Sequence, residues 1–429
     1  MRRQGRIETI SPDEAVKVVR SGNRVVTGHA AGEPRLLVDA LAKRAGELRD
    51  VEVIQLLTLG DGVFCRPEHS ASFRHNGLFT SKTTRQAMAE GRAHLTPCFF
   101  HRVPSLFRDG DLPLDVALVT VTPPDDNGNM SLGVAVDYTL EAVKQARTVI
   151  AEVNPNMPHT GGGSLVHVND IHGFVESDTP LYQTENGTGG EVEKAIGAHI
   201  AGLIDDGCCL QIGIGAIPEA VLDCLGNFRD MGIHSEMISD GVMKLAEKGV
   251  LTGAMKKINR GKIVFTFVVG SGAFYRWLDR NPLVEAYAVD YTNDPCVIGQ
   301  NDNVVSINSA LSVDLLGQVC SEAVGVKQYS GVGGQVDFVR GAARSRGGKS
   351  IIALPSTARG HSRIVAALAP GQPVTTSRND VDWIVTEHGA ACLRGKTVHQ
   401  RARALIEIAA PPFREGLRRE FREVYGYGL

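Results

Sequence analysis

Short apolar runs alternate with longer amphipathic stretches along most of this chain. Runs rich in Val and Ile predict buried strands, and apolar positions repeated at helical spacing predict helices. The candidate strands are Arg24–Thr27, Val51–Leu57, Val116–Val121, Thr148–Val153, Cys209–Ile214, Lys262–Phe267, Val304–Asn308, Ser350–Leu354 and Trp383–Thr386. The candidate helices are Pro34–Ala45, Thr139–Ala146, Gly190–Leu203, Pro218–Leu225 and Thr397–Ile408. This alternation predicts open α/β domains with mainly parallel sheets.

Two glycine-rich segments, about half a chain apart, resemble each other. In Gly28–Pro34 and in Gly213–Pro218, a strand ends in a glycine-rich turn and a proline opens a helix, where its missing N–H costs nothing. The repetition predicts two similar domains in tandem, residues 1–187 and 188–429, divided within the polar segment Thr184–Gly190. Chance is the alternative, because glycine-rich turns between strands and helices are common.

Length and composition agree with this division. The chain has 429 residues, which is too long for one compact domain. Hydrophobic residues make up 43% and charged residues 22%, the balance of a globular protein that buries an ordinary core. The formal net charge of −3 leaves no basic surface for nucleic acid, so we expect no nucleic-acid partner.

The cysteines and the N-terminal residues indicate the cellular compartment of the protein. No C-x-x-C pair occurs, so neither a zinc site nor a disulfide framework is expected. The two arginines of the first residues precede no apolar stretch, and apolar runs such as Ile263–Val269 are too short to span a bilayer. Free thiols fit a reducing compartment, so we expect a cytoplasmic protein without membrane contact. The eight cysteines are Cys65, Cys98, Cys208, Cys209, Cys224, Cys296, Cys320 and Cys392.

The turn at Gly213–Ile217 predicts an anion-binding site. A strand, closely spaced glycines and the start of a helix would point backbone N–H groups at an anion. It is not a dinucleotide-binding fingerprint, because Pro218 stands where the third glycine should be. The alternative is that the glycines meet only a backbone requirement of the turn.

Several other patterns fail as catalytic sites. Gly348-Lys349-Ser350 resembles the end of a phosphate-binding P-loop, but Ala343 occupies the upstream glycine position and a strand follows. Lys349 stays a candidate contact for phosphate, with a solvated lysine as the alternative. The chain contains no G-x-S-x-G sequence and thus no hydrolase serine. Three histidines have no recognised metal-binding spacing, so no metal is expected; they are His159, His167 and His172.

Two polar segments could act together as a reactive centre. Glu236 lies among short polar residues in His234–Gly241, where a solvated surface carboxylate is the alternative. Closely spaced glycines in Tyr329–Phe338 would allow backbone N–H groups to approach a ligand and stabilise an oxyanion, unless the segment is only a connecting loop. Asn308 and Glu387 stand at the ends of predicted strands, where ligands bind in open sheets. Glu387 could instead cap the next helix.

Taken together, these segments resemble the acetyl-CoA hydrolase/transferase family, and in particular its 4-hydroxybutyrate CoA-transferase branch. The similarity covers most of the chain in order. Its segments are TPPDDNGNMSLGVAVD at 122–137, GIGAIPEAVLDCL at 213–225, HSEMISDG at 234–241, NDNVVSINSALSVDLLGQV at 301–319, GVGGQVDF at 331–338, GGKSIIALPST at 347–357 and TEHGAACLRGKT at 386–397.

The resemblance implies two CoA-transferase domains with the active site at their interface, and Glu236 as the nucleophile. It implies CoA-binding residues Gly213, Ile214, Gly215, Ala216, Ile217, Gly331, Gly334 and Lys349, and substrate-binding residues Asn308, Gly333 and Glu387. The segment Thr184–Gly187 imitates the Ser-Glu-Asn-Gly motif of other CoA-transferases, which makes Glu185 the rival nucleophile.

The implied activity is transfer of CoA, by a ping-pong mechanism through a glutamyl-CoA thioester. The donor would be acetyl-, butyryl- or succinyl-CoA, and the acceptor an acid of the 4-hydroxybutyrate, butyrate or itaconate type. CoA would be a substrate, with no permanently bound cofactor, and the protein a homodimer. The alternatives are an acyl-CoA hydrolase with the same intermediate, a non-catalytic nucleotide- or sugar-phosphate-binding protein, and a metal hydrolase. A dicarboxylic acid would need a cation, for which the candidates are His29, Arg35, Arg74 and Arg363.

Overall fold

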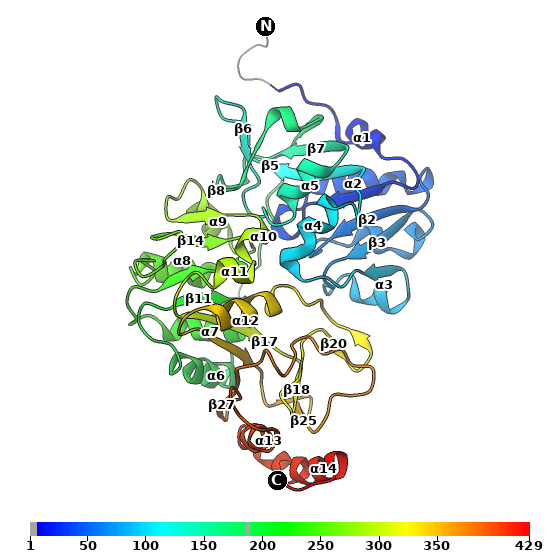
Figure 1. Cartoon of the computed structure of the whole chain (residues 1–429). Helices are drawn as coiled ribbons and strands as arrows, with labels where there is room; N and C mark the ends of the chain where they lie inside the picture. Colours follow the sequence, from blue (N-terminus) through cyan, green and yellow to red (C-terminus); the bar gives the residue numbers. More distant parts are fainter. Residues whose placement is uncertain (1–6, 185–188) are drawn as a thin grey trace. The chain divides into compact units, whose positions relative to one another are not determined.

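The computed structural model describes residues 7–184 and 189–429, and the chain divides into two compact units (Figure 1). The first unit contains Met1–Glu185 and Val264–Thr292, and the second contains Asn186–Ile263 and Asn293–Leu429. A segment from the second half of the chain therefore completes the first unit. The domain boundary expected at 187/188 lies outside the described residues.

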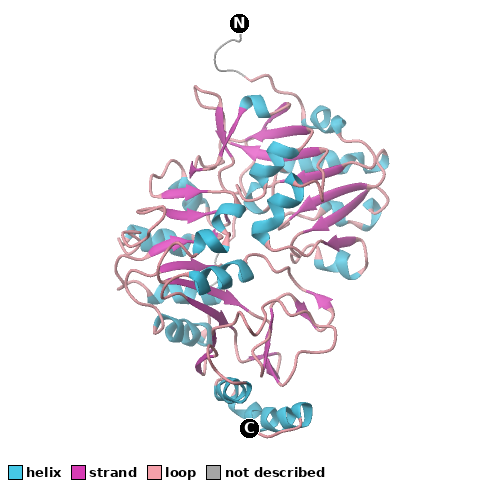
Figure 2. Ribbon diagram, viewed as in Figure 1, coloured by secondary structure: helices cyan, strands magenta, loops and turns pink. Residues whose placement is uncertain are grey.

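The first unit is built on a seven-stranded sheet in the order β10-β7-β5-β1-β2-β3-β4, with all neighbours parallel. The strands are β1 Arg24–Thr27, β2 Val51–Gln55, β3 Phe73–Gly77, β4 Ala93–Leu95, β5 Val116–Val121, β7 Thr148–Val153 and β10 Gly173–Glu176. The helices that accompany them include α2 Arg35–Lys43, α3 Arg85–Ala89, α4 Val103–Arg108 and α5 Thr139–Gln145 (Figure 2). Every residue of β5 is buried, as expected for a central parallel strand.

The returning segment Val264–Thr292 is joined to the first unit through its backbone. Val268 N donates to Val134 O at 2.8 Å, and Val136 N donates to Thr266 O at 3.0 Å. Strand β16 (Val284–Ala286) pairs in parallel with β8 (Gly161–Gly162). The same segment includes helices α9 Gly272–Leu278 and α10 Val289–Thr292.

The second unit has strands in the order β27-β26-β22-β17-β11-β12. Pairing is parallel from β26 to β12, and only β27 runs antiparallel to its neighbour β26. The strands are β11 Cys209–Ile212, β12 Gly232–His234, β17 Val304–Ser309, β22 Lys349–Ala353, β26 Trp383–Thr386 and β27 Gly389–Cys392. The helices include α6 Glu191–Ala201, α7 Ala216–Cys224, α8 Asp240–Glu247, α11 Pro295–Ile298, α12 Gln335–Arg344, α13 Val398–Glu407 and α14 Arg414–Tyr425.

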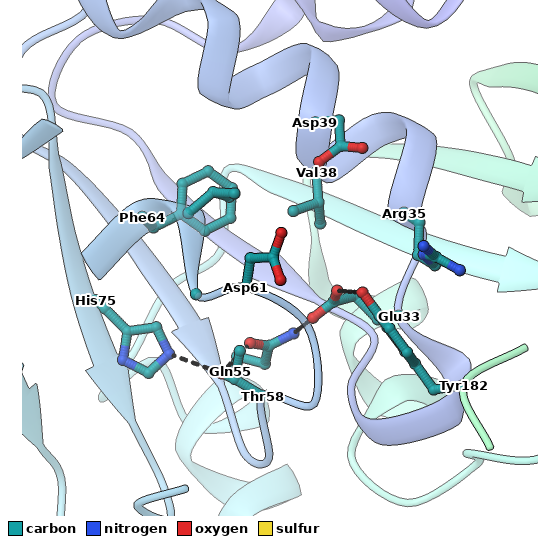
Figure 3. A pocket seen from close by; sticks show the side chains of 12 residues that line it. Glu33, Arg35, Val38, Asp39, Gln55, Thr58, Asp61, Phe64, His75 and Tyr182 are labelled. Atoms are coloured by element: carbon teal, nitrogen blue, oxygen red, sulfur yellow. Dashed lines mark hydrogen bonds between the residues drawn. The ribbon is translucent and has the colours of Figure 1, made fainter. Parts of the chain in front are cut away.

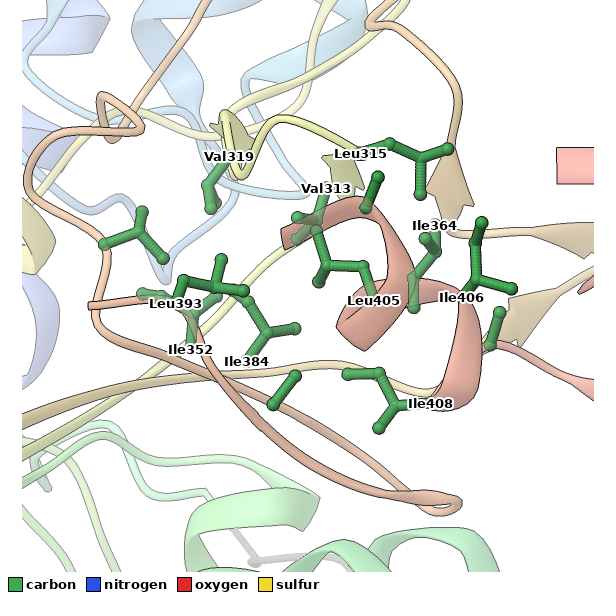
Figure 4. Close-up of a cluster of buried hydrophobic side chains, with 14 of the residues drawn as sticks. Val313, Leu315, Val319, Ile352, Ile364, Ile384, Leu393, Leu405, Ile406 and Ile408 are labelled. Atoms are coloured by element: carbon green, nitrogen blue, oxygen red, sulfur yellow. The ribbon is translucent and has the colours of Figure 1, made fainter. Parts of the chain in front are cut away.

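A buried apolar cluster packs α13 and α14 onto this sheet (Figure 4). Ile352 and Ile384 are paired in register on β22 and β26, and Leu405 and Ile406 of α13 belong to the same fully buried cluster. Burial of each such side chain contributes about 1.5–3 kcal/mol, so the C-terminal helices fix one face of the sheet. The carboxyl ends of the parallel strands are consequently held in one arrangement.

The predicted open α/β class with mainly parallel sheets is confirmed, and most element bounds agree within two residues. One local expectation is wrong, because the prolines do not open the helices. Pro34 is the residue before α2, and Pro218 is the third residue of α7. At both positions a backbone N–H would have no acceptor within the helix, so proline is tolerated there as well. No helix in residues 7–184 and 189–429 combines the length and apolarity needed to cross a membrane.

Candidate active site

The parallel strands of the second unit bring most of the predicted site residues to one edge of the sheet. Because β11, β12, β17, β22 and β26 run in the same direction, the segments that follow them emerge at the same edge, where open α/β sheets bind ligands. The residues at or just beyond these carboxyl ends are Gly213, Ile214, Gly215, Ala216, Ile217, Glu236, Asn308 and Glu387.

Glu236 occupies the turn between β12 and the short strand β13 (Met237–Ile238), where it is half-buried. Asn293 Nδ2 donates to Glu236 Oε2 at 2.7 Å and lies 3.4 Å from Asp337 Oδ2. The two hydrogens of this amide are therefore directed at two carboxylates, which fixes the orientation of the Asn293 side chain. Asn293 Oδ1 is buried and has no hydrogen-bond partner among the described residues.

The glycine loop packs against the same carboxylate. A Cβ atom at Gly334 would overlap both Glu236 Oε2 and Asn293 Nδ2. Gly333 has φ of +54°, a left-handed conformation that favours glycine. Helix α12 begins at Gln335, directly after the loop, so its partially positive end lies beside the Glu236 carboxylate. The structure thus brings Gly334 and Glu236 together, as the sequence analysis expected of the loop that begins at Gly331.

The turn at Gly213–Ile217 has the form of an anion cradle. Gly215 has φ of +109° and precedes α7, and as a glycine it has no side chain to cap the first backbone N–H groups of the helix. Ile214, Gly215 and Ala216 are exposed, whereas Ile217 is buried in the unit. Exposed N–H groups at the start of a nine-residue helix provide a suitable site for a phosphate or another anion.

Asn308 faces a second amide across the sheet. Its Nδ2 donates to Gln211 Oε1 at 3.0 Å, and Gln211 Nε2 lies 3.3 Å from Asn308 Oδ1. Gln211 Nε2 also donates to Ile307 O at 3.3 Å. This pairing fixes both amides at the carboxyl ends of β11 and β17, so Asn308 presents a defined polar group at the site edge.

Glu387 follows β26 and is held by the segment after β22. Ser356 donates both its backbone N, at 2.8 Å, and its hydroxyl to the Glu387 carboxylate. Partial burial alone would raise the pKa of Glu387, but the hydrogen bonds from Ser356 and the nearby His388 hold it below the usual value. Glu387 is therefore an anion at neutral pH, and it does not act as the cap of a helix in this position.

Lys349 is separated from this group. It begins β22, at the amino end of the sheet, whereas the other site residues follow the carboxyl ends. Its Nζ donates to Leu203 O at 2.7 Å and lies 3.2 Å from Asp205 Oδ2. The expectation that Lys349 joins the other CoA-binding residues is not met, because a parallel strand carries its first and last residues to opposite edges.

The four cations considered for a dicarboxylic acid have different surroundings. His29 is fully buried against Asp137, Arg35 lies over the ring of Tyr182, and exposed Arg74 lies near Asp50. Arg363 is half-buried in the second unit, where its Nη1 lies 3.5 Å from Ala310 O. Burial lowers the pKa of Arg363 from its ordinary value.

The rival chemistry receives no support from the described residues. The alternative nucleophile Glu185 lies outside the described part of the chain. Within the described ranges, no group of three or more His, Cys, Asp or Glu side chains is arranged to hold a metal ion. His167 Nε2 instead contacts Asn127 O at 3.0 Å, and His172 Nδ1 accepts from Val149 N at 3.1 Å.

A small polar cavity of about 70 Å³ lies within the first unit (Figure 3). Gln55 joins two sides of it, donating to Glu33 Oε2 at 2.7 Å and accepting from the Thr58 hydroxyl at 2.5 Å. Burial raises the pKa of Glu33 and lowers that of His75 to about 4. Hydrogen bonds connect Glu33, Gln55, Thr58 and His75 in sequence, and Tyr182 extends this network at Glu33 Oε1.

Sequence reasoning missed Asn293. It lies in the loop before α11, next to Asp294, whose side chain caps that helix by accepting from Cys296 N at 2.6 Å. A polar residue beside a helix cap has an ordinary local explanation, so a single sequence carries no signal of its contact with Glu236. Only the fold shows that residues 57 positions apart meet.

Comparisons with known proteins agree over most of the chain. The family model of the acetyl-CoA hydrolase/transferase N-terminal domain matches residues 2–181, and that of the C-terminal domain matches 270–421. A 4-hydroxybutyrate coenzyme A transferase of Clostridium kluyveri is 53% identical over 416 residues, which cover 96% of this chain and 97% of the relative.

Solved structures give the same result. RipA from Yersinia pestis superposes with a TM-score of 0.93 at 37% identity, over 97% of this chain and 98% of that one. A 4-hydroxybutyrate CoA-transferase from Porphyromonas gingivalis superposes with a TM-score of 0.84 at 42% identity, over 97% of each chain.

Proposed function

The chain belongs to the acetyl-CoA hydrolase/transferase family, and we propose that it is a CoA-transferase that uses Glu236 as its nucleophile. The observation that carries the proposal is the placement of the Glu236 carboxylate between the amide of Asn293 and the backbone of Gly334. The substrates are an acyl-CoA, of the acetyl, butyryl or succinyl type, and a short carboxylic acid. Because one relative acts on 4-hydroxybutyrate, that acid is the first candidate, followed by butyrate and itaconate.

The reaction begins with a carboxylate, which needs no general base to act as a nucleophile. Its oxygen attacks the thioester carbonyl of the acyl-CoA, which forms a mixed anhydride and expels CoA as the thiolate. The thiolate then attacks the glutamyl carbonyl, which forms a glutamyl-CoA thioester and releases the first acid. The incoming acid reverses both steps, so one difficult exchange becomes several easier ones with ping-pong kinetics.

Asn293 is suited to the second of these steps. When the thiolate adds to the glutamyl carbonyl, negative charge develops on a carboxyl oxygen of Glu236. Asn293 Nδ2 already donates to Oε2, and the start of α12 places a partially positive helix end nearby. Donors fixed in advance stabilise such an oxyanion without reorganisation.

The turn at Gly213–Ile217 supplies the proposed site for a phosphate of CoA. Exposed N–H groups at the start of α7 bind an anion far from the reacting sulfur. Binding energy gained on the distant part of CoA then lowers the barrier at the thioester. The proposed CoA- and acid-binding surface is completed by Gly331, Gly333, Asn308 and Glu387. CoA is a substrate, and the proposed reaction uses no permanently bound cofactor.

Trapping of the intermediate tests this proposal. Incubation of the protein with the acyl-CoA donor and no acceptor should add the mass of CoA, less one water, to the intact chain. Borohydride or hydroxylamine should then modify a peptide that contains Glu236, and Glu236→Gln should abolish both the adduct and the transfer. Label on Glu185 instead would assign the nucleophile to the rival segment, and turnover without any adduct would overturn the mechanism.

A CoA hydrolase would form the same intermediate and release it to water. The two activities are separated by measuring CoA transfer to an acceptor acid and the release of free CoA, with and without that acid. Transferase activity predicts that free CoA stays low with and without the acid, and that an added acid is converted to its CoA thioester. A dominant release of CoA without acceptor would favour the hydrolase.

The proposal places the enzyme in the cytoplasm as a homodimer. No disulfide joins any of the eight cysteines, all of which lie in the described part of the chain, and this fits a reducing compartment. Light scattering at micromolar concentration tests the dimer, which predicts about twice the mass of 46.0 kDa calculated for one chain.

A further inference from the structure

Two buried serines flank Glu236 and tie its turn to a neighbouring segment. Ser235 Oγ donates to Ile212 O at 3.0 Å and accepts from Ile212 N at 3.1 Å. Ser239 Oγ donates to Glu219 Oε1 at 2.7 Å. Ile212 and Glu219 lie on either side of the proposed CoA-binding turn, so the turn that carries Glu236 is attached at both ends to the segment that binds CoA.

Ser239 acts differently from an ordinary helix cap. It is the residue before α8, where a serine usually accepts a backbone N–H of the first helical turn. Here its side chain makes no capping hydrogen bond and its hydroxyl donates to Glu219. The Glu219 carboxylate lies beside the start of α8, because a Cβ atom at Gly241 would be 2.7 Å from Glu219 Oε2. Negative charge is favourable at that end of a helix.

Burial of the Glu219 carboxylate costs free energy, which argues that this contact does more than pack α7 against α8. Burial raises the pKa of Glu219, which means that the folded unit disfavours its charged form, and the hydrogen bond from Ser239 only partly offsets this. Apolar side chains would join α7 to α8 without that cost. A polar contact of defined direction is better suited to setting a position than to adding stability.

We propose that Ser239 and Glu219 are positioning residues, which hold the Glu236 turn in register with the CoA-binding turn. The inference rests on the proposed function, since it takes Glu236 as the nucleophile. Ser235 provides the second attachment. Glu236 is then aimed from the same rigid segment that holds the distant part of CoA, and a loss of either attachment loosens the nucleophile without removing any group that contacts the substrate.

The test compares binding with the rate of formation of the covalent adduct. Ser239→Ala and Glu219→Ala should each slow the appearance of the glutamyl-CoA mass about tenfold, with KM for acyl-CoA within about twofold. Ser239→Thr retains the hydroxyl and should recover most of the rate. The double variant should be no slower than the slower single variant, because both changes remove the same contact.

A buried serine elsewhere in the unit provides the matched control. Ser345 Oγ donates to Asn301 O at 2.6 Å and accepts from Val304 N at 3.0 Å, near the amino end of β17. Ser345→Ala should lower the unfolding temperature and leave the adduct rate of the folded protein unchanged. Equal slowing by Ser345→Ala and Ser239→Ala would overturn the inference and leave both serines with a structural role only.

Hydrogen exchange gives a second readout. Binding of free CoA should protect the amides of 213–217 and also those of 235–239 in the wild-type protein. In Ser239→Ala, CoA should still protect the amides of 213–217 but no longer those of 235–239. Unchanged protection of 235–239 would refute the attachment. If Glu236→Gln still turns over, the proposed function fails. If Glu236→Gln is inactive while Ser239→Ala forms the adduct at the normal rate, only the positioning inference fails.

Discussion

Asn293 Nδ2 lies 2.7 Å from Glu236 Oε2, and Asp337 accepts from the other side of the same amide at 3.4 Å. The amide therefore holds two carboxylates near each other in the second unit. In the proposed mechanism its role extends beyond the ground state, since the oxygen it contacts is the one on which charge would develop when the glutamyl carbonyl is attacked.

Replacement of Asn293 should therefore impair catalysis more than binding. Asn293→Ala removes a fixed donor to the developing oxyanion, and we expect kcat to fall about 100-fold with little change in KM for acyl-CoA. Asn293→Asp should be worse, because it places a third carboxylate beside Glu236 and Asp337. Initial rates at varied acyl-CoA measure both effects.

The control for this prediction is Asn301→Ala. Asn301 is also fully buried in the second unit, and its Oδ1 accepts from Lys257 N at 2.9 Å. It precedes the amino end of β17, whereas the candidate site lies at the carboxyl ends of the strands. Asn301→Ala should lower the free energy of unfolding and leave kcat unchanged. A similar fall in kcat for both variants would show that Asn293 acts only through the fold.

Gly334→Ala should inactivate the enzyme while the second unit stays folded. The added methyl group would occupy the positions of Glu236 Oε2 and Asn293 Nδ2, so the nucleophile must turn away. We expect a loss of at least about 100-fold in kcat, the scale of a nucleophile displaced by one ångström. Gly416→Ala in α14 is the matched change, because its nearest neighbour would be 4.0 Å away. Full activity of Gly334→Ala would contradict the close approach of the loop.

Lys349→Met tests which edge of the sheet binds CoA. Lys349 Nζ is bonded to Leu203 O at the amino end of β22, so its loss should leave KM for acyl-CoA within about twofold. Replacement of a lysine that contacts a phosphate would raise KM by a larger factor. A tenfold rise in KM would restore Lys349 to the CoA-binding residues and would require CoA to reach the amino end of β22.

Local patterns were sufficient to predict the fold class and the strands with pronounced apolar runs, but they did not predict β3, β4, β10, β12 or β27. The Val- and Ile-rich runs that became β5, β7 and β17 are buried on both faces, and a parallel sheet requires this composition. The same patterns could not show that Val264–Thr292 returns to the first unit, because apolar runs do not specify their partners.

The candidate site was predictable only in part. Glu236, Gly334 and Glu387 lie in runs of several distinctive residues, so a family resemblance could identify them. Asn293 and Glu219 are single polar residues whose local surroundings explain them equally well as loop and helix positions. Lys349 shows a different limit, since its glycine-lysine-serine string suggested phosphate binding but gave no sign that the strand direction carries it to the opposite edge of the sheet.

Acid sensitivity of the first unit should depend on His75. Burial lowers the pKa of His75 from its usual 6.5 to about 4, so below pH 6.5 the unfolded chain binds a proton that the folded unit does not. Its contribution to the free energy of unfolding is therefore intact above pH 6.5 and falls by about 1.4 kcal/mol per pH unit between 6.5 and 4. Burial also raises the pKa of Glu33, which changes the stability in the opposite direction, so the pH dependence of the wild-type protein alone does not measure the contribution of His75.

His75→Gln should be less stable than the wild type at pH 7 yet lose less stability on acidification. The difference in unfolding free energy between the two proteins should narrow by up to about 3 kcal/mol near pH 4. Urea unfolding monitored at several pH values measures this difference; parallel pH curves for the two proteins would show that folding does not lower the pKa of His75.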